Sequence, residues 1–200
     1  MKSATWKSTL ALLALAALAG CAQPPTEEIA KADEAMDAAR AAEAPDYAPT
    51  EWAAVEDHRE QLDSELDSQR QASALSRSYE HARSLAAETT ELADQAAAEA
   101  LGGKARAQED AAMAIEQAKK LEQEVARLLE NAPQGKGTKV DLAAMRSDAG
   151  SSEASLQEAQ RSYEAGSYLD AHVKADEVVR RLQGIKDEIE RAREVRGGRA

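Results

Sequence analysis

Apolar residues recur three and four positions apart along most of the chain, the spacing that places side chains on one face of an α-helix. The first such stripe predicts a helix that ends near Ala44, and the second predicts a helix that begins at Pro49, since proline suits the first helical position. The two stripes consist of Ile29, Ala32, Met36 and Ala39, and of Trp52, Val55, Leu62 and Leu66. Between them, "APDYAPTEW" holds two prolines and predicts a break.

A third stripe is interrupted by Gly102-Gly103 and then resumes in near-heptad spacing. Two glycines within a helix cost about 2 kcal/mol relative to alanine, so we expect the helix to bend or to break there. The stripe contains Leu75, Tyr79, Ala82, Leu85, Thr89, Leu92, Ala96 and Ala100, and its continuation contains Ile115, Ala118, Leu121, Val125 and Leu128.

"NAPQGKG" at 131–137 predicts a turn, and two further stripes follow it. Gly166 and Ser167 separate these stripes, and Ser167 with Asp170 resembles a capping box at a helix start. At the other end of the chain, Thr26 is placed to cap the first helix after the helix-blocking Pro24-Pro25. The last two stripes are Leu142, Met145, Leu156, Ala159 and Tyr163, and Leu169, Val173, Val178, Val179, Leu182, Ile189 and Ala192.

Two parts of the chain match each other. "EWAAVEDHREQLDSEL" at 51–66 matches "DLAAMRSDAGSSEASL" at 141–156, and "SYEHARSLA" at 78–86 matches "SYLDAHVKA" at 167–175. Each unit then reads as helix, turn and helix, a helical hairpin used twice. Chance similarity in an alanine-rich chain is the alternative.

Composition narrows the fold class. Hydrophobic residues make up 43% of the 200 residues, but only 3% are aromatic, phenylalanine is absent, and most apolar residues are alanine. Such a core suits closely packed helices better than a compact globule, and β-branched residues are too sparse for a sheet. We expect an all-α, elongated, coiled-coil-like bundle of two related antiparallel helical hairpins joined by a long helix. The helical body spans 27–200, with hairpin one at about 27–100, a connecting helix at about 104–130 and hairpin two at about 138–196.

The N-terminal segment follows a different pattern. A short basic start with Lys2 and Lys7 precedes an apolar run from Leu10 to Leu18, which is shorter than the roughly 20 residues a helix needs to cross a bilayer. This layout predicts a secretory signal at 1–20 rather than a membrane span. The tetrad Leu18-Ala19-Gly20-Cys21 resembles the lipobox of bacterial lipoproteins, followed by a linker at 21–26.

The resemblance implies that the thiol of Cys21 receives lipid and that signal peptidase II, recognising Leu18, Ala19 and Gly20, cuts before it. More than one acyl chain gives stable anchoring where a single chain binds only marginally. Ala22 follows Cys21 where the family's best-known inner-membrane retention signal has Asp. In a Gram-negative host this implies the outer membrane, with the body facing the periplasm. An ordinary signal with an incidental cysteine is the alternative.

A second resemblance covers about residues 26–100. "ARAAEAPDYAPTEWAAVEDHREQLDSEL" followed by "SYEHARSLAAETTELADQAAAEA" resembles the DUF4398 domain, a helical segment of unknown function common in bacterial lipoproteins. Tyr-Ala-Pro at 47–49 is the most specific part of the match. Some relatives add a peptidoglycan-binding domain, but this sequence shows no such domain, so that binding is not implied.

Candidate chemistry is sparse. The residues three before His58, His81 and His172 are Val55, Ser78 and Leu169, so the Glu-x-x-His motif of di-metal bundles fails at each histidine. No phosphate-binding loop or nucleophile motif occurs, and we expect no catalytic residue, metal or cofactor. The net charge of −12 disfavours both nucleic acid and anionic lipid head groups as partners of the helical body.

We therefore expect a non-catalytic lipoprotein, anchored to the membrane through Cys21, with a structural or adaptor role. Its long helical faces would contact another envelope protein or its own copies. A periplasmic holdase-type chaperone and a binding module for a cell-wall component are the alternatives. An adaptor requires an exposed apolar stripe, whereas a holdase requires a cavity between hairpins.

Overall fold

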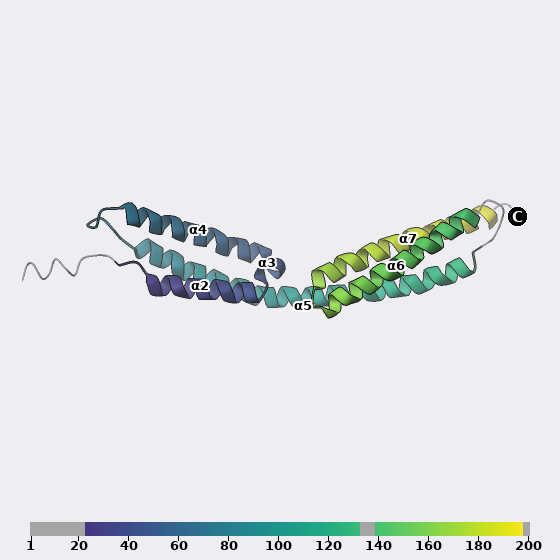
Figure 1. Ribbon diagram of the computed structural model, residues 1–200, viewed down its shortest axis with the longest axis horizontal. Helices are drawn as coiled ribbons and strands as arrows, with labels where there is room; N and C mark the ends of the chain where they lie inside the picture. The colour runs from purple at the N-terminus through teal and green to yellow at the C-terminus, as the bar shows by residue number, and fades with distance from the viewer. Residues whose placement is uncertain (1–22, 133–138, 198–200) are drawn as a thin grey trace, which may run out of the picture. The chain divides into compact units, whose positions relative to one another are not determined.

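The computed structural model of the protein describes residues 23–132 and 139–197. Within these two ranges the chain forms helices and no strand, so the predicted all-α fold is confirmed (Figure 1). The expected signal segment 1–20, with Leu18, Ala19 and Gly20, lies outside the described residues, as does Cys21. The helices are α2 (Thr26–Ala41), α3 (Ala44–Tyr47), α4 (Pro49–Gln71), α5 (Glu80–Glu130), α6 (Lys139–Glu164) and α7 (Tyr168–Gly197).

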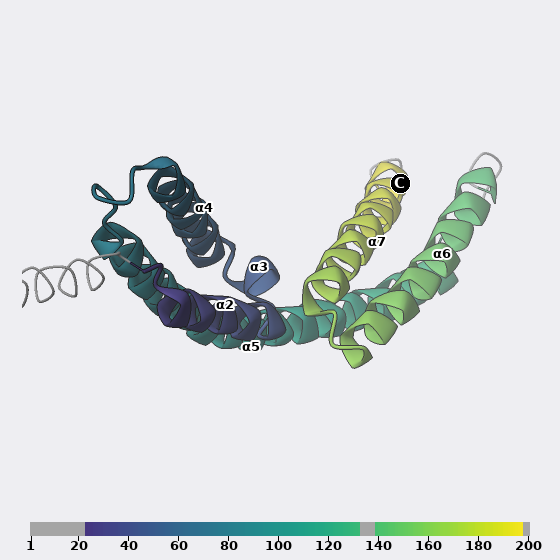
Figure 2. The ribbon, with the colours of Figure 1, turned by 60° about the vertical axis from the view of Figure 1, so that its left-hand side comes forward.

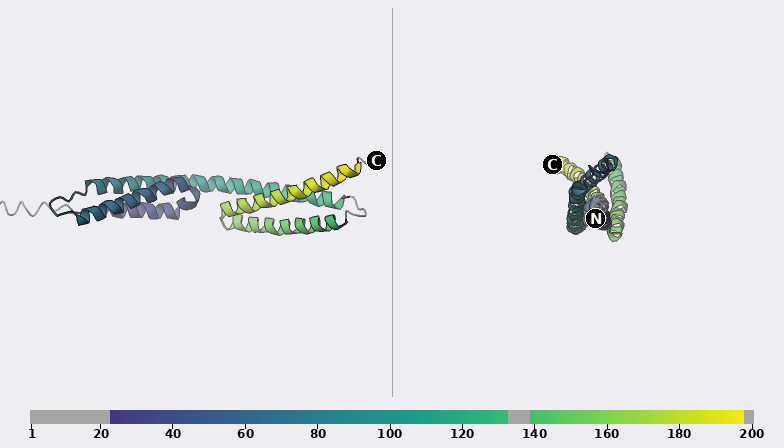
Figure 3. Two further views of the ribbon diagram at one scale, coloured as in Figure 1. Left: turned by 90° about the horizontal axis from the view of Figure 1, so that it is seen from above. Right: turned by 90° about the vertical axis from the view of Figure 1, so that its left-hand side faces the viewer.

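The chain divides into two compact units between Gly103 and Lys104. The first unit contains α2, α3, α4 and the first part of α5, and the second contains the rest of α5 with α6 and α7 (Figure 3). The segment expected to be a connecting helix, at 104–130, is thus the second part of α5. Its apolar residues from Ala114 to Leu129 belong to the core of the second unit.

In the first unit, α2 and the first part of α5 lie side by side and run in the same direction, and α4 packs against them and runs the opposite way (Figure 2). The start of α2 and the end of α4 meet the first turns of α5, where Ile29 and Leu62 pack beside Ala82. Further along, Met36 and Trp52 pack against alanines of α5. These alanines, Ala93, Ala96 and Ala100, are fully buried, and their small side chains let the helices approach closely.

The core of the second unit uses larger side chains. Leu121, Val125 and Leu129 of α5 meet Leu142 and Leu156 of α6. From α7, the core receives Ala175, Val178, Leu182, Ile185 and Ile189. Because α6 runs opposite to α5 and α7, the second unit is an up-down-up bundle of three helices around one core.

Helix α5 continues without interruption through Gly102-Gly103, so of the two outcomes considered, a bend or a break, the break is excluded. The reason is a close approach between helices. A Cβ atom built at Gly103 would lie well inside 3.0 Å of the carbonyl oxygen of Tyr47, at the end of α3. Gly103 therefore occupies a position on the buried stripe where no side chain fits.

The helix ends also have identifiable causes. Glu43 ends α2 in the left-handed region with a φ of 61°, and Gly166 ends α6 with a φ of 81°. At Gly166 the backbone bonds Gly166 N–H to Tyr163 O and Ser167 N–H to Ser162 O are those of a Schellman motif. The prediction that Thr26 caps the first helix is wrong, because Thr26 is itself the first residue of α2 and Pro25 holds the capping position. Pro49 begins α4, as predicted.

Burial follows the internal match that the sequence suggests. At one constant offset, six of the seven buried positions of the first part of α5 have a buried partner in α7, and the exception is Leu85, whose partner Lys174 is half-buried. The pairs are Ala82 and Ala171, Ala86 and Ala175, Thr89 and Val178, Ala93 and Leu182, Ala96 and Ile185, and Ala100 and Ile189. In α4 and α6, Leu62 corresponds to Ser152, and both are fully buried. The burial pattern agrees with the internal match at these positions.

Four residues assigned to apolar stripes are exposed, namely Leu75, Leu169, Val173 and Ala192. Leu75 is fully exposed in the segment between α4 and α5, which is not helical, so its assignment to the third stripe is wrong. Leu169 and Val173 of α7 are 45% and 61% exposed. Ala171 and Ala175 take the buried positions of these turns, because alanine permits the closest helix packing.

Candidate functional site

The described chain begins two residues after the expected anchor. Pro25 is buried, and Ile29 packs on the cluster that contains Leu66, Tyr79 and Ala82. An ion pair of 3.8 Å between Glu28 and Arg83 joins the first turns of α2 and α5. The described chain therefore begins at the end of the first unit that carries the start of α2.

The α6–α7 turn in the second unit gathers aromatic and apolar side chains. The rings of Tyr163 and Tyr168 lie 5.3 Å apart, centroid to centroid, at an angle of 60°. Gln108 of α5 reaches the Tyr163 hydroxyl at 3.5 Å. Both tyrosines are only half-buried, with Tyr163 packed against the core of the second unit, whereas Trp52 and Tyr79 are buried in the first unit.

A polar network ties the two sides of this turn together. The Ser162 hydroxyl donates to Asp170 at 2.6 Å, and Lys174 donates to the same carboxylate at 2.5 Å. These hydrogen bonds, the one from Lys174 first, lower the pKa of Asp170. Asp170 thus joins α6 to α7 instead of acting only within the predicted Ser167 capping box.

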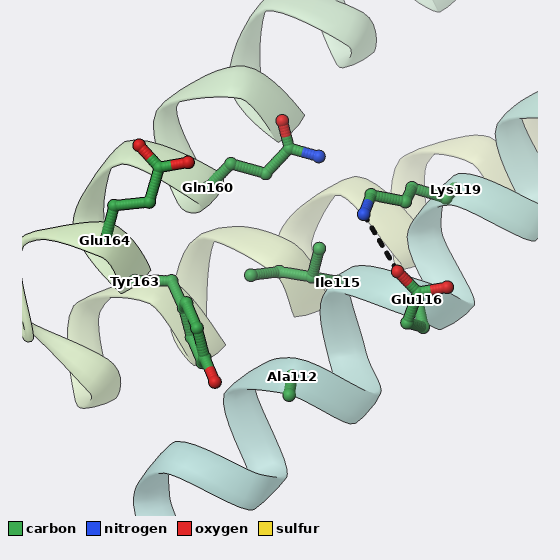
Figure 4. Close-up of a pocket in the computed structure, with 7 residues that line it drawn as sticks. All are labelled: Ala112, Ile115, Glu116, Lys119, Gln160, Tyr163 and Glu164. Carbon is green, nitrogen blue, oxygen red and sulfur yellow. Dashed lines mark hydrogen bonds and ion pairs between the residues drawn. The ribbon is translucent and has the colours of Figure 1, made fainter.

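A shallow cavity of about 360 Å³ lies beside this turn, between α5 and α6 (Figure 4). The Tyr163 ring points from α6 toward Ala112 of α5, and Ile115 lies between the two helices. On its rim, Lys119 donates to Glu116 at 2.8 Å, and this hydrogen bond lowers the pKa of Glu116. The cavity combines an apolar wall with charged edges, a composition suited to an inserted side chain of a partner.

Two further charged groups lie along the second unit. Burial raises the pKa of Glu122 in α5, and repulsion from Glu153 of α6 raises it further. Lys186 of α7 donates to Glu124 of α5 at 2.7 Å, and this hydrogen bond raises the pKa of Lys186. The ion pair between Lys186 and Glu124 thus supports the contact between α5 and α7. The repulsion between Glu122 and Glu153 opposes the contact between α5 and α6.

The histidines do not meet as ligands. His58 is 3.0 Å from the carbonyl oxygen of Ala54 and 3.7 Å from Glu88, and His172 is 3.7 Å from Asp176. His81 lines a polar cavity of about 590 Å³ between α4 and α5. Across residues 23–132 and 139–197, no three His, Cys, Asp or Glu side chains are grouped so that they could hold a metal ion.

The α6–α7 site was missed from the sequence because Leu169 and Val173 were assigned to a buried face. The signal that could have revealed it is "RSYEAGSYLDAHVK", in which Ala171 repeats the position of the buried Ala82. Placing Ala171 inward turns Leu169 and Val173 outward on α7. These two residues lie one turn apart and are both exposed.

None of the helices in the described part of the chain combines the length and apolar character needed to span a membrane. Comparison with protein-family models, with curated proteins and with solved structures finds no match to this chain.

Proposed function

We propose that the protein is an outer-membrane lipoprotein, anchored through Cys21, whose helical body acts as a non-catalytic adaptor in the periplasm. The observation that carries the anchoring is the tetrad Leu18-Ala19-Gly20-Cys21 at the end of a short apolar run. The chain has a single cysteine, so no intramolecular disulfide accounts for it. Residues 26–100 resemble the DUF4398 domain of bacterial lipoproteins, which agrees with this proposal.

The short link between anchor and body supports the same function. Helix α2 begins at Thr26, so the first unit follows the lipidated residue almost directly. A body held this close to the membrane presents its helices to other envelope proteins. Position 22 is Ala, whereas the inner-membrane retention signal has Asp there, and this supports an outer-membrane location in a Gram-negative host.

The adaptor role rests on the exposed apolar side chains of α7 beside the aromatic turn. Leu169 and Val173 present an unpaired apolar edge, and the cavity at Tyr163 lies on the same unit. An amphipathic helix of a partner, or of a second copy, would cover such an edge by spacing its own apolar residues three and four apart. Aromatic side chains in this setting supply much of the contact energy of protein interfaces.

Site-specific photocrosslinking in native envelopes tests this role. A crosslinking amino acid at Val173 is expected to trap one envelope protein or a second copy of the chain. The same amino acid at Asp187, an exposed position further along α7, is the matched control and is expected to trap neither. Equal crosslinking at both positions, together with suppression of client aggregation by the purified protein, would replace the adaptor by a holdase.

A further inference from the structure

One leucine is displayed to solvent by a well-ordered set of hydrogen bonds. Leu75 has an exposed fraction of 102%, the highest among the large apolar side chains exposed in the described residues. It lies in a turn closed by Ser76 N–H donating to the Ser73 carbonyl oxygen at 2.9 Å. The hydroxyls of the two serines are 2.7 Å apart. The turn therefore fixes Leu75 outward.

The flanks of the turn are held as well. The Arg77 guanidinium donates to the carbonyl oxygens of Ala72 and Arg70, at 3.1 and 3.2 Å. On the other side, Ser78 N–H donates to the side chain of Gln69 at 2.9 Å. These hydrogen bonds join the turn to the end of α4.

The charge of this segment differs from that of the rest of the chain. Between Asp67 and Glu80 the sequence contains Arg70 and Arg77 and no carboxylate, in a chain with a net charge of −12. Arg70 pairs with Asp67 at 2.6 Å, whereas the carbonyl acceptors of Arg77 are neutral and leave its charge uncompensated. A cation beside an exposed leucine matches a phospholipid surface, where phosphate lies above acyl chains.

The position of this turn indicates which surface it contacts. The turn joins α4 to α5 at the end of the first unit where α2 begins (Figure 1). Cys21 precedes Gln23 by two positions in the sequence, so a lipid on Cys21 would be tethered to the described chain by at most about 7 Å of extended backbone. If Cys21 carries lipid, this end of the unit is held at the membrane and the turn is held there with it.

We infer that the turn at 73–76, with Leu75 at its tip and Arg77 beside it, is a second, non-covalent contact of the protein with the phospholipid surface. This inference rests on the proposed lipidation of Cys21. A single leucine binds a membrane only weakly, but the tether keeps it at high local concentration. The contact then fixes which face of the first unit meets the bilayer instead of adding to the strength of anchoring.

Tryptophan fluorescence in proteoliposomes tests the contact. The full chain with Leu75→Trp is reconstituted in vesicles of phosphatidylethanolamine and phosphatidylglycerol that carry bromine on the acyl chains. We expect a blue-shifted emission that the brominated lipid quenches at least about twofold. The parent protein supplies the background, which comes from the buried Trp52 and, in any chain that retains residues 1–20, from Trp6. Leu101→Trp is the matched control, since Leu101 is 66% exposed and lies about 30 Å along α5 from its start.

Two preparations separate the failure of this inference from failure of the anchor. One carries the lipid added in the cell, and the other is coupled through Cys21, the only thiol, to a maleimide phospholipid. No lipid on the first preparation overturns the natural anchor, while the second still tests the turn. Quenching absent at Leu75→Trp in the coupled protein, or equal at Leu101→Trp, overturns the membrane contact. Shielding from aqueous acrylamide without lipid quenching assigns the turn to a protein partner instead, and also overturns it.

Discussion

Gly103 of α5 lies directly against the carbonyl oxygen of Tyr47, so close that a Cβ atom at this position would overlap it. The alanine-lined face of α5 and the last residue of α3 meet at this point. The contact explains why position 103, in the middle of the long helix α5, holds glycine instead of a residue that favours helix. Gly103 therefore serves packing, at the usual cost of glycine in a helix.

Gly103→Ala is expected to destabilise the protein by about 1–3 kcal/mol, because the backbone of Tyr47 must move to admit a methyl group. Gly150→Ala and Gly184→Ala are matched controls, since a Cβ atom at either position meets nothing within 4 Å. They should stabilise the protein by about 0.5–1 kcal/mol through helix propensity. Urea unfolding measures all three, and equal stabilisation by Gly103→Ala would contradict the packing argument.

The raised pKa of Glu122 predicts a pH-dependent gain from its removal. The folded protein holds this proton more tightly than the unfolded chain does, so ionised Glu122 opposes folding at every pH above its folded pKa. Glu122→Gln should raise the free energy of unfolding by a few tenths of a kcal/mol at neutral pH. The gain should shrink as pH falls through the folded pKa and vanish below 4.5.

Glu109→Gln is the control for this experiment, because Glu109 lies exposed on the same helix. Thermal unfolding across the acid range gives the comparison. A gain that is as large for Glu109→Gln, or one that grows toward acid pH, would show that burial and Glu153 do not act on Glu122 as described.

The network at the α6–α7 turn gives the opposite pH dependence. Hydrogen bonds from Lys174 and Ser162 lower the pKa of Asp170 below its usual 3.8, so its contribution is complete above that pH and is lost as pH falls through the folded pKa. Asp170→Asn should cost roughly half a kcal/mol at neutral pH, discounted for exposure to solvent. Acid titration of the unfolding midpoint should show the two proteins converging at low pH. A constant difference across the titration would contradict the assignment, and Glu188→Gln on the exposed part of α7 should change little.

The internal match predicts the outcome of exchanging residues between its two halves. Thr89 and Val178 occupy corresponding buried positions, and the Thr89 hydroxyl donates to the Leu85 carbonyl oxygen at 2.7 Å. Thr89→Val should leave stability unchanged or raise it by up to about 1 kcal/mol, because that carbonyl keeps its helical partner. Val178→Thr should cost about 1–2 kcal/mol in the more apolar second core. Guanidinium unfolding compares the two, and a larger loss from Thr89→Val would argue against equivalent environments.

Much of the fold could be predicted from spacing alone. The stripe Trp52, Val55, Leu62 and Leu66 is buried as predicted, because each of these side chains is large and apolar and the helix has one such face. The start of α4 at Pro49 could also be predicted, because proline suits the first position of a helix. The spacing gave a wrong prediction in α7, where two faces of the helix carry apolar residues. Leu169 and Val173 were expected to be buried because they are larger, but Ala171 and Ala175 form the buried face.

Other features depend on contacts that no local pattern contains. Gly103 packs against a residue far away in sequence, and Asp170 meets Ser162 across a turn. Leu75 continues the spacing of the helix that follows it, but Ser73, Ser76 and Arg77 make hydrogen bonds that hold it outside that helix. The exposure of Leu75 and the contact between the Tyr163 and Tyr168 rings both depend on tertiary structure.

The most direct test of the central claim is the mass of the mature N-terminus. The full chain, expressed in a Gram-negative host and extracted with detergent, should yield a protein that begins at Cys21 and carries a diacylglyceryl group on sulfur with a further acyl chain on the amino group. The same chain with Cys21→Ser should leave the detergent phase. A mature protein that begins at another residue, or a Cys21 without lipid, would contradict the account.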